Sequence, residues 1–107
     1  MSAALVCLLL IAATAGGCTG KGSLHVLVVA EDGTPLSGAK VISNTQPQGQ
    51  MKVTGGTDSE GEVTYSGIAA GEYEFYVSRF DYENQVFQVR VKAGRTTDVT
   101  VTLEKTG

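Results

Sequence analysis

The sequence predicts an all-β domain, a sandwich of two antiparallel sheets, behind a short uncharged leader. Hydrophobic residues after Ser23 recur with a period of two rather than 3.6, the spacing of a half-buried strand. Turn-forming stretches rich in Gly and Asp separate these segments at short intervals, as in sandwiches. After the leader, no window of ten or more residues shows the stripe of an amphipathic helix. The 107 residues fit one such domain.

The leader is predicted to be a targeting segment, because the first twenty residues carry no charged side chain. Its non-polar run, Ala3–Ala13, is 11 residues long, whereas a membrane span needs about 20. That length and the small residues after it are typical of a secretory signal. Two sites of cleavage are open: after Ala15, which ends an A-x-A signal and leaves a soluble secreted chain, or before Cys18. An uncleaved N-terminal anchor is a third possibility.

The residues before Cys18 favour the second site. The stretch Ala15–Cys18 (AGGC) resembles the lipobox of bacterial lipoprotein precursors, where small residues precede the cysteine that becomes the new N-terminus. The resemblance implies that residues 1–17 are a lipoprotein signal peptide and that Cys18 is lipidated. Residues 18–22 would then be the lipidated Cys and a short flexible tether.

Seven segments are predicted to be strands: 24–30, 39–43, 50–54, 62–66, 71–78, 85–92 and 97–104. The first is hydrophobic at nearly every position, which predicts cover on both faces. The fifth, sixth and seventh alternate, so that one wall of each is hydrophobic and the other is polar. The predicted core combines Val26 or Val28 with Tyr73, Phe75, Phe87, Val89 and Val99.

Turn residues join these strands. Glu31–Pro35 ends the first strand, and 93–95 joins the sixth to the seventh. Between the third and fourth strands, we expect Asp58 to accept backbone N–H bonds within its own turn and Gly61 to adopt a positive φ. Ile68 is expected to enter the core at the corner before the fifth strand.

The order of these pieces resembles the carboxypeptidase regulatory-like domains. The opening, turn and corner motifs of that family match Asp32, Gly33, Pro35, Leu36, Gly38, Ala39 and Val41, then Thr57, Asp58 and Gly61, then Gly67, Ile68, Gly71 and Tyr73. The resemblance implies a seven-stranded transthyretin-like (prealbumin-like) sandwich, with Greek-key, immunoglobulin-like topology, over residues 23–104. These domains are add-on modules in enzymes, receptors, adhesins and lipoproteins, so the resemblance implies a fold rather than a ligand.

Several kinds of chemistry are not expected. Both cysteines, Cys7 and Cys18, lie in the leader and the only histidine is His25, so we predict no metal site, cofactor or catalytic group. A net charge of −3 without a basic patch argues against a nucleic-acid partner. The related Cna B-type modules can carry a Lys–Asn crosslink, but segment 24–30 has no Lys and Val77 stands where their acid is expected.

The stretch Arg79–Asn84 mixes aromatic and hydrogen-bonding side chains, as contact loops do. It provides the predicted ligand contacts, Tyr76, Phe80, Tyr82 and Asn84, although Tyr82 could instead pack inward at the family's corner.

The predicted function is that of a non-catalytic cell-envelope lipoprotein carrying a protein-interaction or structural module. It would be anchored by lipid to the cell membrane or outer membrane, on the extracytoplasmic side, with another envelope protein as a possible partner. The alternatives are a carbohydrate-binding module, since starch-binding domains have similar sandwiches, or an accessory domain assisting an extracytoplasmic enzyme in trans. Exposure of both Tyr76 and Phe80 would favour a glycan, whereas a bare hydrophobic patch or an unpaired edge strand would favour a protein.

Overall fold

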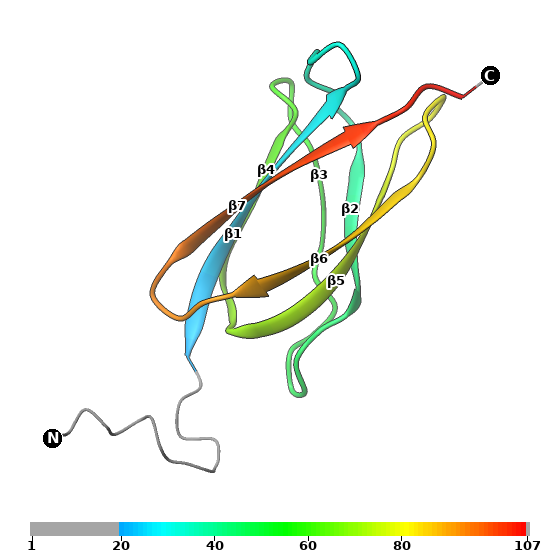
Figure 1. The fold of residues 1–107 in the computed structure, drawn as a ribbon. Coiled ribbons are helices and arrows are strands. Elements are labelled where there is room, and N and C mark those ends of the chain that lie inside the picture. The colour runs from blue at the N-terminus through cyan, green and yellow to red at the C-terminus, as the bar shows by residue number, and fades with distance from the viewer. Residues whose placement is uncertain (1–19, 107) are drawn as a thin grey trace, which may run out of the picture.

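The computed structural model describes residues 20–106, which form seven strands and, within that range, no helix (Figure 1). The all-β prediction is therefore confirmed. The expectations for residues 1–17 and for Cys18 lie outside the described residues. None of the described segments is a helix long and hydrophobic enough to cross a membrane. The strands are β1 (Lys21–Ala30), β2 (Lys40–Thr45), β3 (Thr54–Gly56), β4 (Glu62–Ala69), β5 (Gly71–Ser78), β6 (Gln85–Val91) and β7 (Thr96–Leu103).

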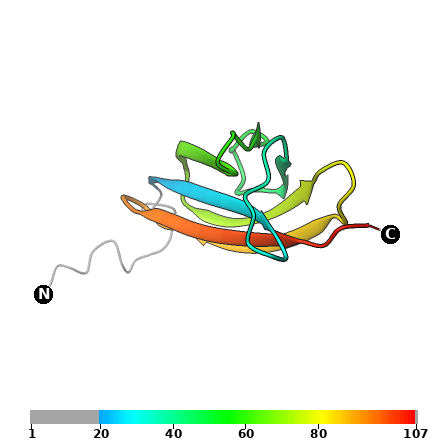
Figure 2. The same ribbon diagram turned by 90° about the horizontal axis from the view of Figure 1, so that it is seen from above.

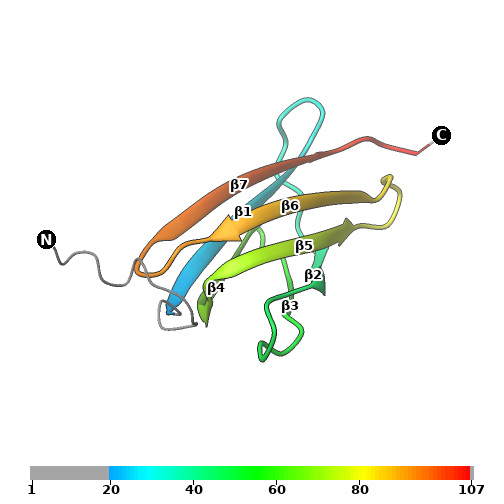
Figure 3. The same cartoon turned by 60° about the horizontal axis from the view of Figure 1, so that its bottom comes forward.

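The strands form two sheets that lie face to face (Figure 2). One sheet has three strands in the order β4-β1-β7, and the other has four in the order β3-β2-β5-β6. All neighbours are antiparallel except β1 and β7, which run parallel. Strands β6 and β7 contact each other and are both sheet edges, so they lie on the same side of the sandwich (Figure 3).

Several strand bounds differ from the prediction: β1 begins at Lys21, inside the predicted tether at 18–22, and β4 extends to Ala69 rather than 66. Two predictions were wrong in more than their bounds. The third strand was expected at 50–54 but covers only Thr54–Gly56, because the preceding segment turns at Pro47–Gln50. That segment is held to β2 by one backbone bond, from the Ser43 N–H to the Val53 carbonyl at 2.8 Å, and by side chains. There the N–H of Val53 donates to Ser43 Oγ, and Lys52 Nζ donates to the Ser43 carbonyl.

The first strand was expected to be covered on both faces, but its burial alternates. Leu24, Val26 and Val28 are fully buried, whereas His25 and Leu27 between them are only half-buried. With just two layers in the sandwich, the outer face of β1 has no sheet to pack against.

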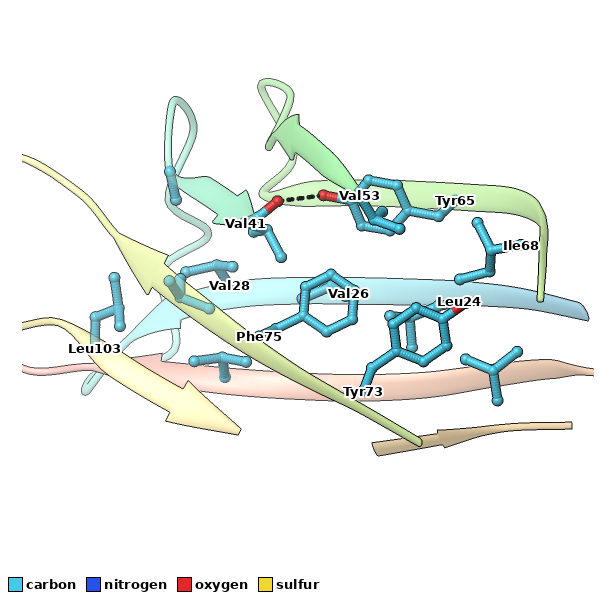
Figure 4. Packing of buried hydrophobic residues seen from close by; sticks show 14 of the residues in the cluster. Leu24, Val26, Val28, Val41, Val53, Tyr65, Ile68, Tyr73, Phe75 and Leu103 are labelled. Carbon is cyan, nitrogen blue, oxygen red and sulfur yellow. Dashed lines mark hydrogen bonds between the residues drawn. The ribbon is translucent and has the colours of Figure 1, made fainter. Parts of the chain in front are cut away.

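The core lies between the sheets and contains a run of stacked aromatic rings (Figure 4). The ring of Phe75 lies 5.3 Å from Phe87, 5.7 Å from Tyr73 and 5.8 Å from Tyr65, measured between centroids. Ile68 is buried as predicted. Of the predicted core, Val26, Val28, Tyr73 and Phe75 are buried, while Phe87, Val89 and Val99 are half-buried at its margin.

One phenol crosses the core to the opposite sheet. The Tyr65 hydroxyl, on β4, donates to the Val41 carbonyl of β2 at 2.6 Å (Figure 4). Burial raises the pKa of Tyr65 from 10.0 to about 12, because the charged phenolate would lose its solvation. This hydrogen bond ties the two layers together, because it joins a side chain of β4 to the backbone of β2 inside the core.

The turn before β4 has the predicted chemistry. Asp58 Oδ1 accepts the backbone N–H of Glu60 at 2.9 Å and of Glu62 at 3.0 Å, and these bonds lower the pKa of Asp58. Gly61 has φ 77°. A Cβ at Gly61 would lie 2.8 Å from the Val28 carbonyl oxygen, so both the backbone angle and the close approach require glycine.

Candidate functional site

The outer face of the four-stranded sheet carries a band of hydrophobic side chains. Tyr76 on β5 pairs in register with Ile42 on β2 and with Val86 on β6. Ile42 and Tyr76 alternate with buried neighbours along their strands, and Val86 precedes Phe87, which packs against the core, so all three point away from the core. Val86 is 50% exposed, and Ile42 and Tyr76 are half-buried. We call Ile42, Tyr76 and Val86 the hydrophobic row.

Polar side chains flank the row on one side. Glu74, two residues before Tyr76, accepts hydrogen bonds from Asn44 Nδ2 at 3.3 Å and from Gln88 Nε2 at 3.5 Å. Farther along, Glu72 and Arg90 form an ion pair across β5 and β6. The acidic groups on this flank are therefore already engaged by neighbours on the same face.

The opposite flank is positively charged and ends in an exposed aromatic ring. Gly38, Lys40, Ser78, Arg79 and Phe80 line a shallow concavity of about 390 Å³. No carboxylate lines it, and within residues 20–106 neither cation forms an ion pair. The Phe80 side chain is 85% exposed. This place, which we call the Phe80 concavity, combines two cations with an uncovered ring.

Local contacts hold the loop that presents Phe80. Arg79 Nε donates to the Ser37 carbonyl at 2.6 Å, and its guanidinium lies 5.5 Å from the centre of the Tyr82 ring. Asp81 adopts φ 72°, which lets the chain turn sharply between the exposed Phe80 and the inward-facing Tyr82. The loop is therefore built to direct one aromatic outward and the other inward.

The four predicted contact residues do not form one cluster. Tyr76 and Phe80 lie on the same outer face, one in the hydrophobic row and the other at the concavity. Tyr82 is half-buried, packs against the core and bridges Lys105. Asn84 is exposed just before β6. A role in binding stays a prediction for all four.

The sequence reasoning missed three residues of this face: Ile42, Val86 and Lys40. Their outward-facing positions could have been read from the alternation within each strand. Their position next to Tyr76 or Phe80 depends on which strands pair and in what register, and that is set by the tertiary structure.

The only histidine lies on the outer face of the other sheet. His25 Nε2 is 3.1 Å from Glu62 Oε1 on β4, and Nδ1 is 3.0 Å from Asp98 Oδ1 on β7. The hydrogen bond with Glu62 is the largest influence on the His25 pKa and raises it; burial opposes this, and Asp98 adds to the rise. His25 therefore joins three strands by charge-assisted bonds.

Other chemistry finds little support in the part of the chain that the structure describes. Both nitrogens of His25 are held by carboxylates on opposite sides of the ring, which leaves neither free to act as a base. Residues 20–106 contain no group of three His, Cys, Asp or Glu side chains arranged to hold a metal. For a crosslink, Lys40 and Asp98 lie on different sheets, and Val77 is fully buried.

The comparisons with known proteins match this fold. The family signature described as "Carboxypeptidase regulatory-like domain" covers residues 23–104. No protein of curated function is similar enough to match.

Several solved structures share the fold at low sequence identity. The Bacillus anthracis TIE protein has a TM-score of 0.70 and 21% identity, over 80% of this chain and 17% of its own. The minor pilin GBS52 of Streptococcus agalactiae has a TM-score of 0.67 and 24% identity, over 82% of this chain and 46% of its own. A 3-chlorocatechol 1,2-dioxygenase of Rhodococcus opacus 1CP has a TM-score of 0.62 and 14% identity, over 85% and 61%.

This chain spans less than two thirds of each of these proteins. At such identities the similarity shows the fold alone, and pilins and dioxygenases share that fold with different functions. The family signature, in contrast, covers most of the sequence, including every strand from β2 to β7. The chain therefore belongs to the carboxypeptidase regulatory-like domain family.

Proposed function

We propose that this protein is a non-catalytic, lipid-anchored protein of the cell envelope that binds another protein through the outer face of its four-stranded sheet. The observation that carries this proposal is the exposed Phe80 beside the hydrophobic row. Scattered exposed hydrophobic residues are ordinary, but aromatic and aliphatic side chains next to an Arg on one face are typical of protein interfaces.

The charges around Phe80 indicate what the partner carries. Lys40 and Arg79 have no ion-pair partner within residues 20–106, although the chain as a whole is acidic. A partner segment with a hydrophobic side chain next to a carboxylate would cover the Phe80 ring and pair with these cations. Such complementarity favours binding and orients the partner.

A glycan is the second candidate, and the structure supports it less. A flat sugar ring needs a flat exposed aromatic surface, but only Phe80 is freely exposed; Tyr76 is half-buried beside the aliphatic Ile42 and Val86. Aliphatic neighbours suit hydrophobic side chains of a protein better than sugar hydroxyls. An extracytoplasmic enzyme assisted in trans would be one form of protein partner.

The proposed location depends on the leader. The lipobox-like stretch ending at Cys18 supports a lipid anchor, with the domain on the extracytoplasmic side. The similar structures include pilins, which supports the same side of the membrane. Cleavage after Ala15 would instead give a secreted protein.

The anchor is tested by metabolic labelling with a fatty-acid probe. We expect the full chain to be labelled and the Cys18→Ser variant to be unlabelled. An unlabelled wild type, or equal labelling of the variant, contradicts lipidation at Cys18.

The binding face is tested by crosslinking and pull-down from membranes that contain the full chain. Phe80→Ala is compared with Met51→Ala, because Met51 is 82% exposed and belongs to the loop that lies against the start of β5, whereas Phe80 follows its end. We expect Phe80→Ala to lose the captured protein and Met51→Ala to retain it. Equal capture by both variants would reject this face as the site, and recovery of a glycan in place of a protein would support the second candidate.

A further inference from the structure

The outer edge of β7 is a second surface, separate from the proposed binding face. Within residues 20–106, β7 pairs with β1 on one edge and with no strand on the other. Natural proteins protect free edges with short strands, bulges, Pro or Lys. The edge strand β3 is protected in this way, since it is three residues long. Strand β7 has eight residues, TTDVTVTL, in unbroken register with β1 and without Pro, Lys or Arg.

The direction of the free backbone groups follows from one hydrogen bond. Beyond the end of β7, the Glu104 carbonyl accepts the N–H of Glu83 at 2.7 Å, so Glu104 directs its backbone away from β1. Successive residues of a strand direct their N–H and C=O groups to opposite edges. Thr102, Thr100 and Asp98 therefore present N–H and C=O groups to the free edge, while the residues between them bond to β1.

The same side of the sandwich leaves part of the core uncovered. Phe87 and Val89 on β6, and Val99 on β7, point inward but are only half-buried. Because β6 and β7 are both edge strands there, no further strand of the described chain covers these side chains. The unpaired backbone groups of β7 and these half-buried side chains therefore lie on the same side of the sandwich, where β6 and β7 run side by side (Figure 3).

We propose that this side binds a second copy of the chain, with the two β7 strands pairing antiparallel around a two-fold axis near Val99 and Thr100. The free stretch is bounded by the β6–β7 turn at 92–95 and by residues 104–106, which pair with 81–83. Its centre falls at Val99–Thr100. Strand pairing about this centre joins the two three-stranded sheets into one continuous sheet.

The strand is complementary to itself in both registers centred there. If Thr100 lies opposite Thr100, then Asp98 lies opposite Thr102; if Val99 lies opposite Val99, then Asp98 lies opposite Thr100. Neither register sets two charges against each other, and β-branched residues pair with β-branched residues. The half-buried Phe87, Val89 and Val99 would lie beside the corresponding edge strands of the second copy. A C2 contact of this kind is closed and does not propagate into a filament.

The test measures the mass of the full chain, produced with its own leader and purified in detergent, over about a hundredfold range of concentration. Thr100→Asp places a carboxylate opposite Asp98 or opposite itself in either register. The side chain of Thr100 is exposed, so the Thr100→Asp variant should fold. Thr100→Val keeps the shape of the residue and its N–H, and serves as the matched control. We expect dimers for the wild type and Thr100→Val, and monomers for Thr100→Asp.

Amide hydrogen exchange identifies the edge directly. In the dimer, exchange at Asp98, Thr100 and Thr102 should slow as the dimeric fraction rises, whereas Val99 and Val101, already bonded to β1, should be protected at every concentration. A wild type that stays monomeric overturns the proposal. So does a dimer in which the three amides exchange freely, or one that Thr100→Asp leaves intact. Phe80→Ala should not change the dimer, which separates this surface from the proposed binding face.

Discussion

The buried phenol of Tyr65 should make the stability of this protein depend on alkaline pH in a way that one substitution removes. In the folded chain, the Tyr65 hydroxyl donates a hydrogen bond to the Val41 carbonyl and has a pKa of about 12, against 10.0 for an exposed tyrosine. The folded state therefore holds this proton more tightly than the unfolded state. Its contribution is complete below about pH 10 and is lost as the pH rises through 12.

The magnitude follows from the two pKa values. The difference of about two units between the two pKa values corresponds to a contribution of about 2.7 kcal/mol to the free energy of unfolding. About 1.4 kcal/mol of this contribution is lost by about pH 11. In Tyr65→Phe the hydroxyl is absent, so the variant should lose about 1 kcal/mol at pH 7 because the buried hydrogen bond to the Val41 carbonyl is lost. The stability advantage of the wild type should consequently shrink above about pH 10 and vanish near pH 11.

Urea denaturation of both proteins at pH 7 and at several values up to about pH 11 measures this difference. Titration of other groups changes the free energy of unfolding of both proteins equally, so it cancels in the difference between them. Tyr76→Phe, on the outer face, controls for the loss of a tyrosine and should not converge with the wild type in this way. A wild-type advantage that stays constant to pH 11, or its absence at pH 7, would refute the reasoning.

Three further outcomes follow from local geometry. Gly61→Ala should lower the free energy of unfolding by about 1–3 kcal/mol in urea titration, because φ 77° and the Val28 carbonyl at 2.8 Å both disfavour a Cβ; an unchanged midpoint would contradict this. Phe75→Ala should cost about 3–5 kcal/mol through the cavity it leaves among the stacked rings, and a smaller loss by calorimetry would mean that the core collapses to fill it. For His25, the raised pKa means that its bonds with the two carboxylates stabilise the folded state most below pH 6.5 and that this contribution is lost as the pH rises through the folded-state pKa. Melting curves should therefore show His25→Gln losing more stability at pH 5.5 than at pH 8.5, and equal losses would argue against stabilisation by these two bonds.

Local features of the sequence were enough for several of these conclusions. The period-two alternation placed Tyr73, Phe75 and Val77 on one face of β5, and the structure buries all three. The hydrogen bonds of Asp58 and the positive φ of Gly61 follow from residue type within one turn. The same alternation that located the other strands predicted the third strand at the wrong residues. Segment 50–54 alternates like a strand, but the chain meets β2 in register only from Thr54 onward.

The candidate site was less accessible to this reasoning. Tyr76 and Phe80 could be singled out as outward-facing aromatic residues near one loop. The residues that lie next to them on the outer face could not be predicted, because Ile42 and Lys40 come from β2, more than thirty residues away along the chain. The inward turn of Tyr82, left open by the sequence, follows from the bridge to Lys105 at the far end of the chain.

The sequence alone determined the class of fold and which side chains of most strands face inward, because the alternation of a strand and the conformational needs of a turn depend on adjacent residues. Only the tertiary structure decided that Ile42, Tyr76 and Val86 form one row, that His25 lies between Glu62 and Asp98, and that β7 pairs parallel with β1 and leaves its other edge free. Strand order and register depend on hydrogen bonds and packing between distant segments, which no local pattern encodes.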